Sequence, residues 1–270
     1  MSEPGHFETD LVHHCGPSAS GEYVCTTQIV DVATGWSERA TSLGRSQLVM
    51  SDTFERIENR LPFRILEIHP DNGSEFFNHH MVRFWKDLFP GVRLTRSRPY
   101  HKQDNRIVEQ KNSTLVRAYL GTQRLDTVAQ TLALNQLYDK MWIFYNFFQP
   151  VMHQVKKDWI HQDGRQPRLK RNYDKARTPF DRLCATDAIS EERRSQLEAL
   201  RNRTNPRHLR LEIYDSIAEL FSLPCATPGI TEDVYQTLSN RANLDNQVCL
   251  LSKHLPVQST KTPERRGQVR

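Results

Sequence analysis

Apolar residues recur along the first half of this chain with two spacings, and each spacing predicts a different kind of element. The β-rich runs at 6–13, 22–33 and 36–43 predict three consecutive strands that form a meander. Two later stretches carry an apolar residue every three or four positions, which predicts helices that face a core. These stretches contain Met50, Phe54, Ile57 and Leu61, and then Met81, Phe84, Trp85 and Leu88. Between them, the apolar run 63–68 predicts another strand.

Similar patterns continue toward the C-terminus. A short strand is predicted at 92–95, and helices are predicted at about 105–120 and at 127–148. Two further helices, at 190–203 and 206–221, are expected to pack either on the core or on a partner subunit. Strands and helices that alternate in this way are typical of an α/β protein.

Length and composition limit the kind of protein this can be. With 270 residues, 37% of them hydrophobic, the chain can bury one good core and one smaller appendage. It has no apolar run of membrane-spanning length and no secretory signal pattern, so we expect an intracellular protein without a membrane partner. Its five cysteines include no Cys-x-x-Cys pair, which favours reduced thiols over a disulfide framework or a zinc knuckle.

The net charge of +5 is unevenly distributed along the chain. Residues 1–150 carry 16 basic and 17 acidic side chains, whereas residues 151–270 carry 21 and 15. The basic excess is greatest between Lys156 and Arg177, where Trp159 and other aromatic residues are interleaved with it. Basic residues among aromatics suit a polyanion such as DNA. The alternative is a solvated connector whose charges serve solubility alone.

Three acidic residues lie in settings that favour a shared metal site. Asp10 follows His-Phe-Glu-Thr in the first predicted strand, and Asp71 begins Asp-Asn-Gly-Ser-Glu-Phe directly after an apolar run. Glu109 lies on a predicted helix that follows the segment Ser-Arg-Pro-Tyr-His. Asp-Asn-Gly alone is an ordinary turn sequence, so the combination and its order carry the signal.

These motifs resemble the D-D-E catalytic core of retroviral integrases and insertion-sequence transposases. The resemblance covers roughly residues 5–150, with a weaker echo to Leu183, and 37 residues separate Asp71 from Glu109. It implies a ribonuclease H-like fold, a mixed five-stranded sheet flanked by helices, with a basic and mainly helical C-terminal extension. The expected organisation comprises a catalytic core, a basic connector, a helical region and a disordered tail, at residues 1–150, 151–185, 186–254 and 255–270.

The same resemblance implies a reaction. Asp10, Asp71 and Glu109 would hold two Mg²⁺ or Mn²⁺ ions for cleavage and transfer of DNA strands, because hard oxygen ligands suit these cations. The partners implied are element ends, target DNA and further copies of the chain. In a bacterial host the protein would be cytoplasmic and associated with the nucleoid.

Polar and basic residues near Glu109 are candidate DNA contacts. Asn105 and Asn112 lie four residues before and three residues after Glu109, hence on its helix face, and Lys111 is adjacent. Asn105 is equally well explained as a helix N-cap. In the basic segment the candidates are Arg168, Lys170, Arg171 and Lys175.

Other residues near these motifs are better explained by structure. Asp31, close to the end of the second predicted strand, is expected to organise a turn rather than to bind metal. Glu75 is expected to start a helix, and Asp104 to lie in a loop or cap. The sequence His13-His14-Cys15 lacks a spaced second pair of ligands, which favours a strand end over a metal site.

The leading hypothesis is a DNA polynucleotidyl transferase of the transposase or integrase type. Such transposases usually carry a helix-turn-helix region ahead of the core, so the resemblance leaves open a shortened form. One alternative is a non-catalytic DNA-binding or oligomerisation remnant. Another is a ribonuclease H-like nuclease that hydrolyses without joining strands.

Overall fold

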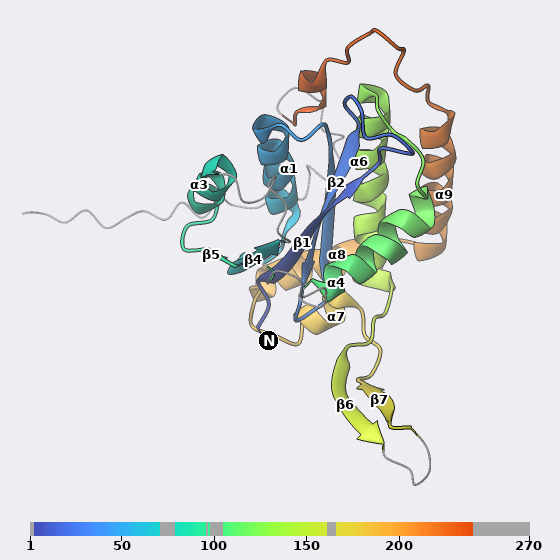
Figure 1. Ribbon diagram of the computed structural model, residues 1–270. Coiled ribbons are helices and arrows are strands. Elements are labelled where there is room, and N and C mark those ends of the chain that lie inside the picture. The colour runs from blue at the N-terminus through green and yellow to red at the C-terminus, as the bar shows by residue number, and fades with distance from the viewer. Residues whose placement is uncertain (1–2, 71–78, 96, 98–104, 161–165, 240–270) are drawn as a thin grey trace, which may run out of the picture.

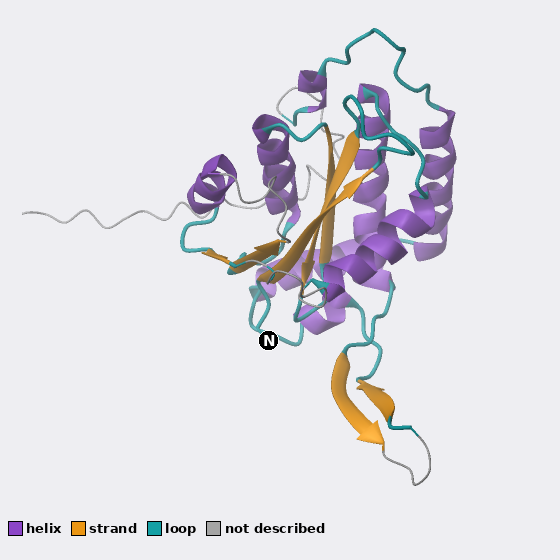
Figure 2. Cartoon of the chain, viewed as in Figure 1, coloured by secondary structure: helices purple, strands orange, loops and turns teal. Residues whose placement is uncertain are grey.

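A twisted five-stranded sheet lies at the centre of the computed structural model, and helices cover both of its faces (Figure 1). The structure describes residues 3–70, 79–95, 97, 105–160 and 166–239. A separate two-stranded hairpin projects beyond one end of the sheet (Figure 2).

The first three strands form the predicted meander. Strands β1 (His6–His13), β2 (Val24–Asp31) and β3 (Ser37–Leu43) pair antiparallel in chain order. Gly35 has φ of +75° in the turn between β2 and β3, a conformation that glycine adopts without strain. The β-rich runs in the sequence therefore identified these three strands.

Two short strands complete the sheet on the other side of β1. Strand β4 (Glu67–Pro70) pairs parallel with β1, and β5 (Arg93–Leu94) pairs parallel with β4, so the order is β3-β2-β1-β4-β5. This mixed five-stranded sheet between helices confirms the ribonuclease H-like fold class. The prediction of a strand at 63–68 was wrong in its position. The main chain begins to pair only at Glu67, whereas Phe63 is buried outside any strand and stacks on Phe7.

One face of the sheet packs against the helices that the apolar spacing predicted. Helices α1 (Gln47–Arg60) and α3 (His79–Leu88) bury Phe54 and Trp85 against each other in an edge-to-face contact with ring centroids 5.2 Å apart. Helices α7 (Pro179–Leu183) and α8 (Glu191–Arg203) contribute to the same apolar cluster.

The opposite face is covered by the helices of residues 106–148 and by the last long helix of the described chain. They comprise α4 (Arg106–Lys111), the π-helical segment η1 (Asn112–Arg117), α5 (Ala118–Leu120), α6 (Val128–Ile143), the π-helical segment η2 (Phe144–Phe148) and α9 (Pro206–Ser222). The helices predicted at 105–120 and 127–148 are confirmed, although the sequence did not reveal their π-helical turns. Helix α9 packs on α6 through Leu209, Ile213 and Leu220.

The C-terminal helices therefore pack on the core, which was one of the two arrangements that the sequence allowed. The structure bears out the helices predicted at 190–203 and 206–221. A short 3₁₀ turn, η3 (Val234–Thr237), follows them. The predicted disordered tail at 255–270 lies outside the described residues.

The basic segment is a β-hairpin and not an irregular connector. Strands β6 (Gln154–Ile160) and β7 (Arg168–Tyr173) pair antiparallel. The basic residues of this segment alternate with β-forming ones, namely Val155, Trp159, Leu169 and Tyr173. This pattern indicates strands, whereas the charge alone does not. The rest of the C-terminal extension is mainly helical, as predicted, through α7, α8 and α9.

Two further sequence expectations bear on the environment of the protein. No helix within the described ranges has the length and apolar character needed to cross a membrane. Among the described cysteines, Cys15, Cys25, Cys184 and Cys225 are free thiols.

The His13-His14-Cys15 sequence ends strand β1, as expected, and holds no metal-ligand cluster among the described residues. His14 is buried, and its Nε2 lies 2.8 Å from the Thr26 hydroxyl. Burial lowers the pKa of His14 to about 3, and the positive charge of Arg117 acts in the same direction. The ring is therefore neutral in the folded protein at physiological pH.

This burial predicts acid sensitivity. Below pH 6.5 the unfolded chain protonates His14 while the folded chain does not, so stability is lost as pH falls from there toward 3. Urea unfolding of wild type and His14→Gln between pH 7.5 and 5.0 should show wild type losing about 1.4 kcal/mol more per pH unit below 6.5. Parallel pH profiles for the two proteins would contradict this explanation.

Candidate active site

Strand β1 holds the N-terminus of helix α4 through a carboxylate that the sequence analysis did not single out. Glu8 Oε2 accepts hydrogen bonds from the backbone N–H groups of Ile107 at 2.7 Å and Val108 at 2.8 Å. Asn105 occupies the N-cap position, but its side chain makes no capping hydrogen bond. The N–H groups at the start of α4, which have no acceptor within the helix, thus donate to a side chain of the sheet.

Asp10, two residues further along β1 and on the same face, contacts the same helical segment. Its Oδ2 accepts a hydrogen bond of 2.6 Å from Asn112 Nδ2, and its Oδ1 accepts one of 2.8 Å from the Leu11 N–H. The Asn112 side chain is buried, and its Oδ1 has no hydrogen-bond partner among the described residues. Asn112 also begins the π-helical segment η1, a geometry often found at functional sites.

Glu109 lies between these two attachment points and three residues before Asn112, so its side chain shares that helix face. The residue is exposed, in contrast to Glu8 and Asn112. Burial raises the pKa of Glu8 to about 7 against the lowering effect of its backbone hydrogen bonds, and the charge of Glu109 raises it further. The charge of Glu109 thus acts on the Glu8 carboxylate of β1.

Asp71, the remaining candidate ligand, lies outside the described residues, as do Glu75 and Asp104. The last described residue before Asp71 is Pro70, which ends β4 in parallel register with Thr9. Thr9 directly precedes Asp10. Within the described residues, to which Asp71 does not belong, no three His, Cys, Asp or Glu side chains form a possible metal cluster. The assignment of Asp71 remains a prediction.

A buried cation lies in the sheet beneath this helix. Gln28 pairs in register with Asp10 on one side and with Arg39 on the other, and both Gln28 and Arg39 are fully buried. The Arg39 guanidinium lies over the rings of Tyr138 and Tyr145, 5.5 and 5.7 Å from their centroids. Sequence analysis missed this residue, because only the strand register shows that it shares the face of Asp10.

The charge of Arg39 affects the pKa of Lys111. Burial lowers the pKa of Lys111 to about 8, and the nearby charge of Arg39 lowers it further. The Lys111 charge in turn contributes to lowering the pKa of His153, after burial and Arg182. The charge of Lys111 thus acts on His153, at the base of the β6–β7 hairpin.

The structure separates the predicted DNA-contact residues into two groups. Asn105, Lys111 and Asn112 accompany Glu109 on the helical segment beside β1. The basic residues of the other group are exposed on the hairpin or directly after it, and they are Arg168, Lys170, Arg171 and Lys175.

Asp31 organises a turn, as the sequence indicated. Its buried carboxylate accepts hydrogen bonds from the Gly5 N–H at 2.8 Å, the Thr34 N–H at 2.8 Å and the Thr34 hydroxyl at 2.6 Å. Burial raises the pKa of Asp31, while these hydrogen bonds oppose that shift. With its lone pairs engaged in this way, the carboxylate serves the β2–β3 turn and the chain entry to β1.

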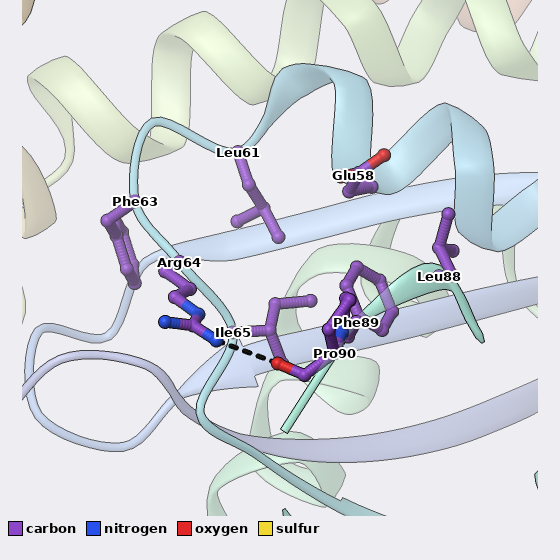
Figure 3. Close-up of a pocket in the computed structure, with 8 residues that line it drawn as sticks. All are labelled: Glu58, Leu61, Phe63, Arg64, Ile65, Leu88, Phe89 and Pro90. Carbon is purple, nitrogen blue, oxygen red and sulfur yellow. Dashed lines mark hydrogen bonds between the residues drawn. The ribbon is translucent and has the colours of Figure 1, made fainter. Parts of the chain in front are cut away.

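A surface pocket of about 230 Å³ lies elsewhere, between the end of α1, the following loop and the end of α3 (Figure 3). The side chains of Leu61, Ile65 and Phe89 face into it. Arg64 closes one side by donating a hydrogen bond of 2.7 Å to the Pro90 carbonyl. None of the candidate site residues lines this pocket, which is explained by imperfect packing where two helices end.

Comparison with known proteins identifies one curated relative and several similar folds. No family model matches the chain. The uncharacterized protein y4rM of Sinorhizobium fredii is 37% identical over 147 residues, which is 54% of this chain and 41% of the relative. This chain thus spans less than half the length of that relative, and the match assigns no activity.

Similar solved structures include viral integrases. The catalytic core of BIV integrase aligns with a TM-score of 0.37 and 17% identity over 54% of this chain and 86% of that chain. An intasome of simian T-cell lymphotropic virus aligns with a TM-score of 0.42 and 14% identity. This alignment covers 65% of this chain and 69% of that chain. The HTLV-2 integrase core in complex with magnesium aligns with a TM-score of 0.36 and 19% identity. This alignment covers 55% of this chain and 90% of that chain. At these TM-scores the fold assignment rests on the sheet topology itself.

The role of Asp31 leads to a prediction that separates stability from metal binding. In Asp31→Asn one carboxylate oxygen becomes an amide N–H₂ that faces a buried N–H donor, which should destabilise the fold by about 1–3 kcal/mol. The Mn²⁺ affinity, measured by calorimetry, should remain that of wild type. Weaker Mn²⁺ binding with an unchanged Tm would show that Asp31 belongs to the metal site.

Proposed function

We propose that the protein is a metal-dependent polynucleotidyl transferase that cleaves and joins DNA strands, with Asp10, Asp71 and Glu109 as its metal ligands. The observation that carries the proposal is the attachment of the helix bearing Glu109 to the strand bearing Asp10, through the Asp10–Asn112 hydrogen bond. The end of β4 beside Thr9 supports it, because Asp71 follows Pro70 directly in the chain.

The available donors fit a hard divalent cation. Asp10 and Glu109 offer carboxylate oxygens, and the exposure of Glu109 leaves its carboxylate accessible from solvent. Mg²⁺ and Mn²⁺ prefer such oxygen ligands and need only a few from the protein. When bound, two such ions about 4 Å apart would activate the attacking oxygen and stabilise the leaving oxygen.

The surrounding residues would position these carboxylates. Asn112 fixes the orientation of the Asp10 carboxylate by donating to one of its oxygens. Glu8 fixes the first turn of α4, and hence the direction from which Glu109 approaches, by accepting from Ile107 and Val108. Lys111, on the same helix, supplies a positive charge for a phosphodiester. Positioning of this kind contributes much of the rate in phosphoryl transfer.

DNA is the substrate that the charge of the chain supports best. The chain carries 37 basic against 32 acidic side chains, and its basic excess lies C-terminal to residue 150. Element ends and target DNA would be the two strands joined, within an assembly of several copies. Association with the nucleoid in the cytoplasm follows from that substrate.

The proposal predicts a metal-dependent reaction that the amide variants lose. Asp10→Asn, Asp71→Asn and Glu109→Gln should each reduce Mn²⁺-dependent cleavage of DNA to background while Tm stays within a few degrees, because the amide keeps the shape but removes the charge. Glu55→Gln, an exposed carboxylate on the opposite face of the sheet, is the matched control and should cleave at the wild-type rate.

Strand transfer with a supercoiled target and pre-cut ends separates the alternatives. Joined products that require all three carboxylates support the transferase. Cleavage without joining identifies a ribonuclease H-like nuclease, and DNA binding without either product identifies a non-catalytic remnant. Wild-type activity in Asp71→Asn would show that the assignment of the site is wrong.

A further inference from the structure

The β6–β7 hairpin stands apart from the body of the protein, and neither of its faces packs on the core (Figure 1). Trp159 is 63% exposed and Val155 is 64% exposed. An isolated two-stranded hairpin is marginally stable in water unless something else buries one of its faces. We therefore ask which kind of partner the exposed side chains of the hairpin would suit.

The two faces differ in how their charges are satisfied. The strand register places Lys156, Asp158 and Lys170 on one face. On this face, called the Asp158 face, Asp158 pairs with Lys156 at 2.8 Å and accepts a hydrogen bond of 2.9 Å from Asn172. Asp158 is thus satisfied within the hairpin, whereas Arg168 and Lys170 on the same face form no ion pair with a described residue.

The other face, called the Trp159 face, consists of Lys157, Trp159, Leu169, Arg171 and Tyr173. Lys157 and Arg171 lie directly opposite each other across the two strands, and neither forms an ion pair with any described residue. Like charges in directly opposed positions destabilise a hairpin. The adjacent cross-strand pair is Trp159 with Leu169, so two unpaired cations border an exposed apolar surface. An anion would relieve the repulsion.

The base of the hairpin is fixed to the core. Arg182 donates to both oxygens of Asp174, at 2.6 and 3.0 Å, and the His153 N–H donates to the same carboxylate at 2.7 Å. Arg182 lies on α7, where Phe180 and Leu183 are buried. The hairpin thus leaves the core from a point that the Arg182–Asp174 pair fixes.

We propose that the Trp159 face binds the backbone of the duplex DNA on which the site acts, with Lys157 and Arg171 on phosphates and Trp159 against the groove wall. This inference rests on the proposed function for the identity of the polyanion. The B-DNA major groove, about 12 Å wide, admits a two-stranded β-ribbon. Strand β6, with seven residues, reaches about 23 Å at about 3.3 Å per residue. A second copy of this face would bring four cations together, which disfavours self-association here.

The test compares two charge-matched pairs of substitutions in the full-length chain. Lys157→Ala/Arg171→Ala and Arg168→Ala/Lys170→Ala each remove one lysine and one arginine, from the Trp159 face and the Asp158 face respectively. Binding of a labelled 30-base-pair duplex of arbitrary sequence is measured by fluorescence anisotropy in EDTA over a series of NaCl concentrations. The first pair should reduce the slope of log affinity against log salt by about 1.8, at about 0.9 per lost phosphate contact. The second pair should leave the slope unchanged, because this proposal removes Arg168 and Lys170, two of the DNA contacts expected from the sequence, from the phosphate-binding face.

Trp159→Ala provides an independent readout. It should weaken binding by the same factor at every salt concentration, because an apolar contact releases no counterions. An equal change of slope in both pairs, or no change in either, would overturn the assignment. Sedimentation showing that Trp159→Ala dissociates an oligomer without affecting DNA binding would also overturn it, and would identify a second copy as the partner.

These outcomes are separable from failure of the proposed chemistry. The binding assay contains no divalent metal, so its outcome does not depend on metal binding, and the control variant Glu55→Gln should give the wild-type slope. A wild-type protein that fails to cleave DNA, yet shows the face-specific slopes, would leave the hairpin assignment in place and remove only the catalytic proposal.

Discussion

Attachment of one helix to one strand fixes how Asp10 and Glu109, the two described candidate ligands, are held. Glu8 and Asp10 are two residues apart on β1, so both side chains point to the same face of the sheet. The first accepts from the backbone at the start of α4 and the second accepts from Asn112 at its end. Two contacts on one short helix fix its rotation as well as its position, and Glu109 lies between them. A single contact would leave that rotation free.

Desolvation of the carboxylates has a cost that the structure offsets in different ways. Glu8 is buried and its pKa is raised to about 7, with two backbone N–H donors as the main opposing influence. Asp31, equally buried, accepts three hydrogen bonds and stabilises a turn. Glu109 instead remains exposed. Among these three, the residue proposed to bind metal is thus the one that structural hydrogen bonds leave accessible.

Sequence patterns predicted the sheet and most of the helices because each depends on local periodicity. The strand predicted at 63–68 began later than expected, since Phe63 and Ile65 are buried without strand pairing and an apolar run does not distinguish the two cases. The hairpin was missed because its charges suggested a connector. The motifs identified Asp10, Glu109 and Asn112, but the roles of Glu8 and Arg39 depend on register, which no single segment of sequence contains.

The central claim is that Asp10, Asp71 and Glu109 converge on one divalent cation, and metal-directed cleavage of the protein itself tests it most directly. Fe²⁺ with ascorbate and peroxide in place of Mg²⁺ generates radicals at the bound ion, and mass spectrometry locates the backbone breaks. The account predicts breaks near residues 10, 71 and 109 together, suppressed by excess Mg²⁺ and absent in Asp10→Asn. Breaks near only one of these positions, or breaks that persist in Asp10→Asn, would contradict it.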